Sequence, residues 1–373
     1  MPHRLIPKRD NSVFSQWWWS ADLPVLAALA ALIFFGMLLS FSATQPLAAS
    51  LGQQHYARAM PHMAYALVAL ALLVAVSFLN ADAVRRAAII ACAACVVLLV
   101  ATLVVGTEIK GARRWLNVFG FSVQPSEFAK PAFAVAAAWL LTAAGGRFRH
   151  PASLAAFGLC ALLCGLLLLQ PDIGQTVIVI FIFGAEFFVA GFSPFLVAAL
   201  ALLGALILLG AYHLFPHVAE RINIFLDPAS GDTYQVERSL EAFGAGGWRG
   251  VGLLDGQIKQ KLPDRQSDFI FAVIGEEMGF VFALLVVLTF MFIAVRVLLK
   301  LSREPRAFAA VAGVGLLTQF IAQTFVNVGS SLQMIPTKGM TLPFLSHGGS
   351  SLLAMGLGMG ALLALLRSPH ITR

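Results

Sequence analysis

Long apolar stretches recur along the whole of this 373-residue chain and limit it to one class of fold. The hydrocarbon core of a bilayer is about 30 Å thick, so a helix of about 20 apolar residues can cross it. Because backbone polar groups inside a bilayer must bond to one another, we predict an all-α, polytopic membrane protein with about ten transmembrane helices. The stretches cover residues 22–42, 59–79, 84–106, 126–144, 152–170, 173–192, 194–215, 270–298, 307–328 and 347–366.

The composition of the chain is also that of a membrane protein. Hydrophobic residues make up 59% of the chain and charged residues 12%, which is far from the usage of soluble proteins. No internal repeat is visible, so we expect a single membrane domain over residues 1–373, with one large extracytoplasmic loop at about 216–268. The formal net charge of +7 reflects the topology described next, so we infer no nucleic-acid partner from it.

Basic residues gather in the short loops on one side of the predicted spans. Short loops rich in Lys and Arg stay in the cytoplasm. We therefore predict that both termini are cytoplasmic and that the loops at about 43–58, 107–125, 216–268 and 329–346 face outward. The basic residues on the predicted cytoplasmic side are Arg4, Lys8, Arg9, Arg85, Arg86, Arg147, Arg149, Lys300, Arg303, Arg306, Arg367 and Arg373.

An acidic residue stands where the large loop enters a span. Asp268 ends a polar run that begins at Lys261, and apolar residues follow it directly. An acid at the mouth of a membrane helix is costly unless it has a function, so Asp268 is the first candidate for a functional group. Basic side chains of the same loop would suit a diphosphate; they are Arg249, Lys259, Lys261 and Arg265.

Further polar residues cluster in the outer loop after the third span and in the turn at 170–175. Glu127 and Lys130 are three residues apart, on one face of the first turn of a predicted helix. This spacing fits a partly buried ion pair as well as a substrate contact, and both interpretations stay open. Asp172 stands at the start of the next span, where we expect it to cap the helix, with a catalytic role as the alternative.

Within the large loop, residues 234–243 have helical spacing. Val236, Leu240 and Phe243 recur at i, i+4 and i+7, which predicts a short amphipathic helix lying on the membrane surface. The glycines of the run 244–252 that follows allow close backbone approach, and its amides could meet an anionic group, although a flexible linker uses the same residues. The four cysteines lie inside spans, where we interpret them as small packing residues, and we predict no metal site.

Several short motifs occur in order over nearly the whole chain, and in this combination the chain resembles the SEDS family. Ile274-Gly-Glu-Glu and Pro336-Thr-Lys-Gly resemble the cell-division branch of that family more than the elongation branch. The segment 265–267 and His347 depart from the residues usual in the family. The motifs are Arg114-Trp115, Gln124-Pro-Ser-Glu127-x-x-Lys130, Pro171-Asp-x-Gly174, Tyr234-Gln235, Leu262-Pro-x-x-x-x-Asp268-Phe-Ile-Phe-Ala, Gly275-Glu-Glu-x-Gly279, Pro336-Thr-x-Gly339 and Leu342-Pro-Phe-x-Ser-x-Gly-Gly-Ser350.

The resemblance implies a peptidoglycan glycosyltransferase that polymerises lipid II into glycan strands during septal cell-wall synthesis. The reaction would take place at the outer face of the cytoplasmic (inner) membrane and release undecaprenyl diphosphate. Forming a β-1,4 link from an α-linked lipid diphosphate inverts the anomeric carbon, so one displacement and one base suffice. Asp268 is the expected base. The expected substrate-binding residues are Arg58, Arg114, Trp115, Glu127, Lys130, Asp172, Gln235, Lys261, Lys338 and Ser346.

The same resemblance implies several partners. They are lipid II, the growing glycan strand, membrane lipids, other divisome proteins and a class B penicillin-binding protein, the septal transpeptidase FtsI. It implies no required cofactor and leaves open whether a divalent cation takes part.

Three other functions would use similar residues. A flippase or transporter of the lipid-linked precursor would need polar groups along a full path through the membrane. Here the acids and bases crowd at the predicted outer ends, and only Glu186 lies toward the inner half, which favours the enzyme. A scaffold for other division proteins would leave Asp268 dispensable. An elongation-type glycosyltransferase would share the chemistry and differ in its cellular role.

Overall fold

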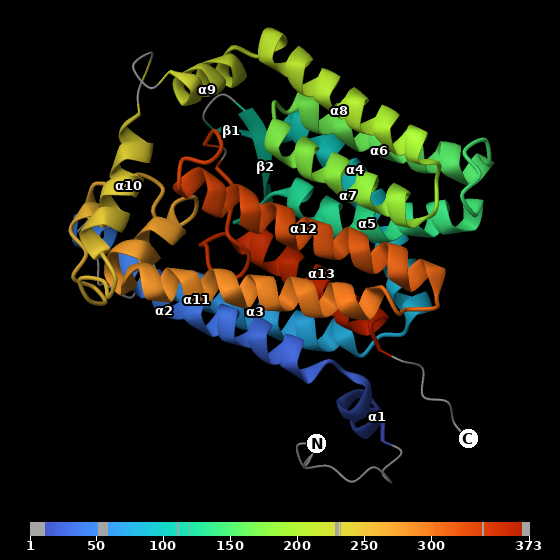
Figure 1. Cartoon of the computed structure of the whole chain (residues 1–373), viewed down its shortest axis with the longest axis horizontal. Coiled ribbons are helices and arrows are strands. Elements are labelled where there is room, and N and C mark those ends of the chain that lie inside the picture. The colour runs from blue at the N-terminus through green and yellow to red at the C-terminus, as the bar shows by residue number, and fades with distance from the viewer. Residues whose placement is uncertain are drawn as a thin grey trace.

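The computed structural model describes residues 12–50, 59–109, 112–118, 120–227, 231, 233–337 and 339–367. Its long helices run side by side as a bundle (Figure 1). Helices on the predicted spans are α2 (Leu23–Ser50), α3 (Ala59–Ser77), α4 (Ala81–Val105), α5 (Pro125–Ala144), α6 (Pro151–Leu169), α7 (Ile173–Val189), α8 (Pro194–Leu214), α11 (Ile270–Leu301), α12 (Ala307–Ser331) and α13 (Gly349–Leu365). The described residues also form α1 (Val13–Ser20), α9 (Pro216–Leu226), α10 (Tyr234–Gly246) and the 3-10 helix η2 (Ile258–Gln260).

Every predicted span coincides with a helix, so the predicted helical, multi-pass membrane architecture is confirmed. Within the described residues, 7 helices are long and apolar enough to cross a membrane by themselves. Helices α7 and α13 are apolar but shorter, with 17 residues each, and α5 carries Glu127 and Lys130 in its first turns. Neighbouring helices cover these three, since α12 packs on both α5 and α7, and α3 packs on α13.

The interior of the bundle is one continuous apolar core. Phe133, Phe183 and Phe320 are among its largest side chains and are fully buried. Lipid tails are as apolar as these side chains, so helix association in a bilayer rests on close packing and hydrogen bonds more than on the hydrophobic effect. Polar side chains between helices therefore matter for the fold, and those at one end of the bundle build the site described below.

A small antiparallel sheet lies where we predicted only an outer loop. It consists of β1 (Thr107–Ile109), β2 (Ala112–Val118) and β3 (Phe121–Val123), in the order β1-β2-β3. Side chains alternate between the two faces of a strand, so Arg114 shares a face with the buried Ala112 and Leu116. The sheet therefore turns Arg114 towards the bundle and Trp115 to the opposite face.

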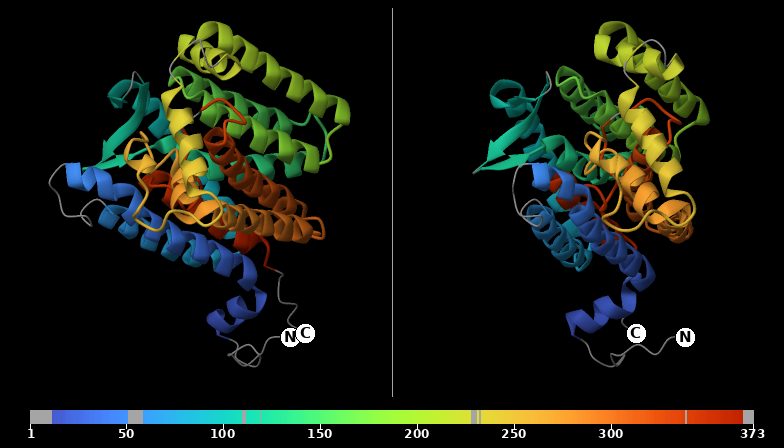
Figure 2. Two further views of the ribbon diagram at one scale, coloured as in Figure 1. Left: turned by 60° about the vertical axis from the view of Figure 1, so that its left-hand side comes forward. Right: turned by 90° about the vertical axis from the view of Figure 1, so that its left-hand side faces the viewer.

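The bundle has two chemically different ends. The end called the Asp268 end below carries the sheet, α10 and the segments 332–337 and 339–348, and α1 lies at the opposite end (Figures 1 and 2). The turns that join α3 to α4, α5 to α6 and α11 to α12 lie at the α1 end. There Arg367 donates hydrogen bonds of 2.9–3.0 Å to the Ser20 hydroxyl and to the Ser77 and Phe78 carbonyls. This arginine ties the end of α13 to its neighbours.

Candidate active site at the Asp268 end

Asp268 lies where several segments of the chain meet. It directly precedes Phe269, the N-cap residue of α11, and it is half-buried. Its backbone carbonyl accepts a hydrogen bond of 2.9 Å from the side-chain amide of Asn327, near the end of α12. The same amide donates to the Met340 carbonyl at 2.6 Å, so Asn327 holds Asp268 beside the segment that follows α12. The N-terminus of a helix favours negative charge, which suits a carboxylate at this position.

The segment 339–347 is fixed against the residues that precede Asp268. The Ser346 hydroxyl accepts a hydrogen bond of 2.7 Å from the Leu342 amide and donates to the Ser267 carbonyl. The His347 amide donates to the Gln266 carbonyl at 2.7 Å. Both bonds of the Ser346 hydroxyl thus go to the backbone, where they position this loop. A substrate contact by Ser346 stays a prediction.

Gly339 leaves room for the Asp268 carboxylate. A Cβ atom at position 339 would lie 3.0 Å from Asp268 Oδ2. The φ angle of Gly339 is +60°, a conformation that residues with a side chain rarely adopt. The Pro336-Thr-x-Gly339 motif therefore brings bare backbone next to the carboxylate. Lys338, a predicted substrate-binding residue, lies outside the described residues.

Arg265 ties the Asp268 loop to the first span. Its Nε donates a hydrogen bond of 2.9 Å to the Ala43 carbonyl of α2. Burial lowers the pKa of the Arg265 guanidinium, but an arginine titrates so far above neutrality that the charge remains. A positive charge therefore lies in the same loop as Asp268.

Arg114 and Asp172 meet at the same end of the bundle. Arg114 Nε lies 3.9 Å from Asp172 Oδ2, and the guanidinium also donates to the carbonyls of Gln170, at 3.1 Å, and Pro171. Asp172 occupies the N-cap position of α7, but its side chain makes no capping hydrogen bond. Our prediction of a capping side chain is wrong, because Arg114 from the unpredicted sheet offers the carboxylate a charged partner.

Glu127 and Lys130 form a buried ion pair in α5. Lys130 Nζ lies 2.9 Å from Glu127 Oε2, and the lysine side chain has no exposed surface. Glu127 Oε1 accepts a hydrogen bond from the side-chain amide of Gln175, in the first turn of α7. Burying two charges is costly, and pairing plus a further hydrogen bond offsets that cost. The ion-pair interpretation is confirmed, and the additional substrate contact stays a prediction.

One hydrogen bond links the start of α5, which carries Glu127 and Lys130, to the start of α13, which follows the segment beside Asp268. The backbone amide of Gln124, just before α5, donates a hydrogen bond of 3.0 Å to Ser350 Oγ in α13. Ser350 lies in the first turn of α13, four residues after Ser346. The Ser346 hydroxyl donates to the carbonyl of Ser267, the residue before Asp268. The segments around Asp268 are therefore neighbours of the segments that carry the other polar residues, at one end of the bundle. These residues are Arg114, Asp172, Glu127 and Lys130.

The remaining predicted site residues lie around this region. Trp115 is half-buried, whereas Gln235 of α10 and Lys261, just after η2, are exposed. The Tyr234 hydroxyl donates to the Lys261 carbonyl at 3.1 Å and joins their two segments. Arg58 lies outside the described residues.

Helix α10 is present, as predicted from its spacing, and it docks on α11 and α12. Ser239, Ala242 and Gly246 are its buried positions, and Ser239 Oγ donates to the Ser331 carbonyl of α12 at 2.7 Å. Leu240 of the predicted apolar face remains 40% exposed. Protein contacts thus hold one face of α10, and its location at the membrane surface stays a prediction.

Two adjacent acids of α11 fasten the large loop to the bundle. The Glu276 carboxylate accepts hydrogen bonds from the backbone amides of Ile258 and Lys259, at 2.6 and 2.7 Å. Glu277 forms a buried ion pair with Lys259 and accepts a hydrogen bond from the Ser42 hydroxyl of α2. We expected Lys259 to face a diphosphate, and this expectation is wrong, because the side chain is buried and neutralised by Glu277. The Gly275-Glu-Glu-x-Gly279 motif therefore has a structural role.

The glycine-rich run packs on a kink in α11. The kink lies at Gly279, where φ is +77°. A Cβ atom at Gly250 would lie 2.1 Å from the Glu277 carbonyl oxygen, and the Gly252 amide donates to that carbonyl at 3.0 Å. The amides of residues 250–252 all bond to protein carbonyls. The structure therefore shows the close backbone approach, and protein carbonyls already accept from the amides of residues 250–252.

Replacing Gly250 with alanine should therefore loosen the large loop. The new side chain meets a carbonyl and a positive φ of 78°, and a strained residue of this kind costs about 1–3 kcal/mol. We expect a lower thermal midpoint in detergent and faster proteolysis within residues 247–262. Gly244→Ala is the matched control, because a Cβ there meets nothing within 4 Å. Equal behaviour of the two variants would contradict the close contact.

Two residues that position the site were not singled out in the sequence. Asn327 holds Asp268, and Gln175 holds Glu127. Both lie inside predicted spans, and a polar side chain in a span needs a partner. The positions of both residues inside spans could have marked them in the sequence, but they do not show which partner each residue has.

The chain is similar to a known protein family and to named proteins over most of its length. A model of the family described as cell cycle protein, covering FtsW, RodA and SpoVE, matches residues 23–370. The chain is 40% identical over 366 residues to the probable peptidoglycan glycosyltransferase FtsW of Caulobacter vibrioides, and the alignment covers 96% of this chain and 93% of that protein. A protein of the same name from Shewanella sediminis is 37% identical, with 94% and 87% covered.

Solved structures share the fold. A chain from a peptidoglycan synthase complex, solved to show the structural coordination of polymerization and crosslinking, has a TM-score of 0.76 and 28% identity. The match covers 94% of this chain and 98% of that one. The rod shape determining protein RodA of Thermus thermophilus has a TM-score of 0.67 and 26% identity, over 94% and 97% of the two chains. The similarity thus extends over nearly the whole architecture.

Proposed function

The chain belongs to the FtsW, RodA and SpoVE family, also called SEDS, and on that premise we propose that it is a peptidoglycan glycosyltransferase. In this proposal it joins lipid II units into glycan strands for septal cell-wall synthesis and releases undecaprenyl diphosphate. Identities of 40% and 37% to proteins named FtsW, against 26% to a RodA, support a role in division over one in elongation.

The placement of Asp268 carries this proposal. Its backbone is held by Asn327, its loop is tied to α2 by Arg265, and glycine backbone lies next to its carboxylate. An ionised carboxylate in such a position can accept the proton of a sugar hydroxyl. The side chain is only half-buried, which leaves part of it accessible to a substrate.

The proposed reaction is a single displacement. The acceptor hydroxyl oxygen attacks the anomeric carbon of the donor sugar, and its proton passes to Asp268. The bond between that carbon and the diphosphate oxygen breaks, and its electron pair leaves with undecaprenyl diphosphate. One displacement inverts the anomeric carbon, so no second carboxylate is needed as a nucleophile.

Cationic side chains at the Asp268 end are proposed to stabilise the departing diphosphate. Arg114 is about one-third exposed and already contacts Asp172, and Lys261 is exposed. Arg58 and Lys338, which lie outside the described residues, belong to the same proposal by their places in the sequence, between α2 and α3 and between α12 and α13. Trp115 would pack on a sugar or on the lipid chain.

We also propose that the chain acts together with a class B penicillin-binding protein. A structural relative comes from a peptidoglycan synthase complex in which polymerization and crosslinking are coordinated. This relative supports an assembly that contains a crosslinking partner. For a division enzyme, the septal transpeptidase FtsI is the partner to test.

Purified full-length protein, incubated with labelled lipid II alone and with the septal transpeptidase, tests the enzymatic proposal. We expect glycan strands to form, at least when the partner is present. Absence of polymer under both conditions would contradict the proposal. If the protein instead moved labelled lipid II between the leaflets of a vesicle, the flippase interpretation would replace it.

We propose that the Asp268 end faces outward and the α1 end faces the cytoplasm. All four cysteines are buried, so a newly introduced exposed cysteine can be labelled selectively. Gln235→Cys and Lys261→Cys should react with a membrane-impermeant thiol reagent in intact spheroplasts. Arg149→Cys, exposed at the α1 end, should react only after the membrane is disrupted. The reverse labelling pattern would overturn this orientation.

A further inference from the structure

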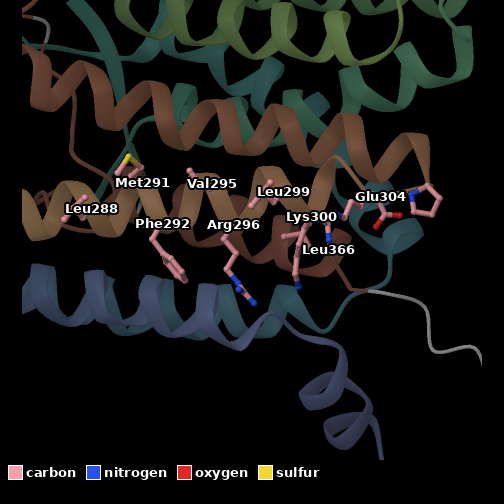
Figure 3. Close-up of a pocket in the computed structure, with 11 residues that line it drawn as sticks. Leu288, Met291, Phe292, Val295, Arg296, Leu299, Lys300, Glu304 and Leu366 are labelled. Atoms are coloured by element: carbon pink, nitrogen blue, oxygen red, sulfur yellow. The ribbon is translucent and has the colours of Figure 1, made fainter. Parts of the chain in front are cut away.

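An open groove runs along the last turns of α11 at the α1 end (Figure 3). Its volume is about 740 Å³. Its apolar part includes Leu288, Phe292, Val295 and Leu299, whose side chains are 43–57% exposed. Helix α11 is kinked at Gly279. The part after the kink, residues 280–301, is about 33 Å long at about 1.5 Å per residue, slightly more than the hydrocarbon thickness of about 30 Å. The apolar turns thus fit the depth of lipid acyl chains, and the last turns reach the headgroups.

Basic side chains line the groove where α11 ends. Arg296 and Lys300 are one turn apart, and their side chains are 37% and 39% exposed. The buried carboxylate of Asp22 pairs with both of them, at 2.9 and 2.7 Å. Phe292 and Arg296 point the same way from α11, towards α2 (Figure 3). Asp22 therefore holds the cationic groups of Arg296 and Lys300 next to each other, beside the apolar side chains of the groove.

The basic side chains at this end of the groove outnumber the acids that could neutralise them. Asp22 carries one negative charge against the two positive charges of Arg296 and Lys300. Glu304, the acid that lines the groove, is bound by Arg306 at 2.6 Å. Arg303 also lines the groove, and within the described part of the chain it forms no ion pair. A ligand with a negative head and an apolar tail would complement this arrangement.

We propose that the groove binds an anionic glycerophospholipid from the leaflet at the α1 end. Arg303, Lys300 and Arg296 donate to its phosphate, and an acyl chain lies along the apolar turns of α11. Basic pockets near the ends of transmembrane helices recognise anionic headgroups in this way. A zwitterionic lipid carries an ammonium group that these cations repel, and a free phosphate lacks the chain that fills the apolar part. The groove lies at the end opposite Asp268, so this inference does not depend on the proposed glycosyl transfer.

Native mass spectrometry of the full-length protein in detergent tests the proposal. The protein is titrated with phosphatidylglycerol or with phosphatidylcholine of identical acyl chains. We expect one phosphatidylglycerol molecule to bind at least tenfold more tightly than phosphatidylcholine. Arg303→Gln should weaken that binding about fivefold, the usual effect of one basic residue near an anionic lipid. Val295→Trp, which fills the apolar part, should weaken the binding of both lipids.

Arg149→Gln is the matched control, because it removes an exposed arginine from the same end but away from the groove. It should leave lipid binding unchanged, and each variant is first checked for an unaltered thermal midpoint. Equal affinity for the two lipids, or equal losses in Arg303→Gln and Arg149→Gln, would overturn the proposal in favour of general surface charge. Competition by glycerol phosphate would assign the cations to a soluble phosphate. If Val295→Trp released a co-purifying membrane protein without affecting lipid binding, the groove would belong to that protein.

Discussion

Replacing Asp268 with asparagine is expected to lower the rate of lipid II polymerisation by about 10²-fold or more, the usual scale for loss of a general base. Asparagine has nearly the same size but cannot take up the proton. The backbone bonds of residue 268, from Asn327 to its carbonyl and from its amide to Asp264, do not involve the carboxylate. The variant should therefore remain folded, insert into the membrane and bind lipid II with nearly unchanged affinity. Polymerisation of labelled lipid II and its equilibrium binding are measured on the same preparation.

Asp255→Asn is the matched control for that experiment. Asp255 is an exposed acid of the same large loop, and its replacement makes the same change in charge. We expect this variant to polymerise lipid II at close to the normal rate. Near-normal synthesis by a correctly inserted Asp268→Asn protein would exclude Asp268 as the base. The flippase and scaffold interpretations would then become the leading ones.

The spans and the main candidate residue could be predicted because each depends on a strong local constraint. An apolar stretch of about 20 residues has few alternatives to a helix in a bilayer, since every backbone group must be paired. Asp268 stood out because a charged residue at the mouth of a span is costly. The spacing of Glu127 and Lys130 likewise predicted a pair on one helical turn, and the structure contains that pair.

The partners of the polar residues could not be predicted, because they come from distant parts of the sequence. Lys259 pairs with Glu277, 18 residues along the chain, and donates to Ser42, 217 residues away. No local spacing in the sequence showed that its charge is already neutralised. Arg114 reaches the carbonyl of Gln170, 56 residues away, and only the short strand β2 orients it there. Glycine in the run 244–252 has the same local freedom whether it meets an anion or a helix. The contact with the kink in α11 decides between the two.

The buried pair in α5 should be far less tolerant of change than surface charges are. Lys130→Met would leave the Glu127 carboxylate without its cation in the interior, where its other oxygen still accepts from Gln175. Removing one partner of a buried ion pair costs about 3–5 kcal/mol. We expect a markedly lower thermal midpoint for this single variant, measured in the detergent used for the parent protein.

The double variant Glu127→Gln with Lys130→Met separates a structural role from a role in binding. It removes both charges, and a glutamine at position 127 can still accept a hydrogen bond from Gln175, so most of the lost stability should return. If the pair is purely structural, polymerisation of lipid II should recover together with the thermal midpoint. If Lys130 also contacts the substrate when it binds, the double variant should be stable and still inactive. Parent-like stability of Lys130→Met would contradict both interpretations, because the carboxylate would then not depend on the lysine.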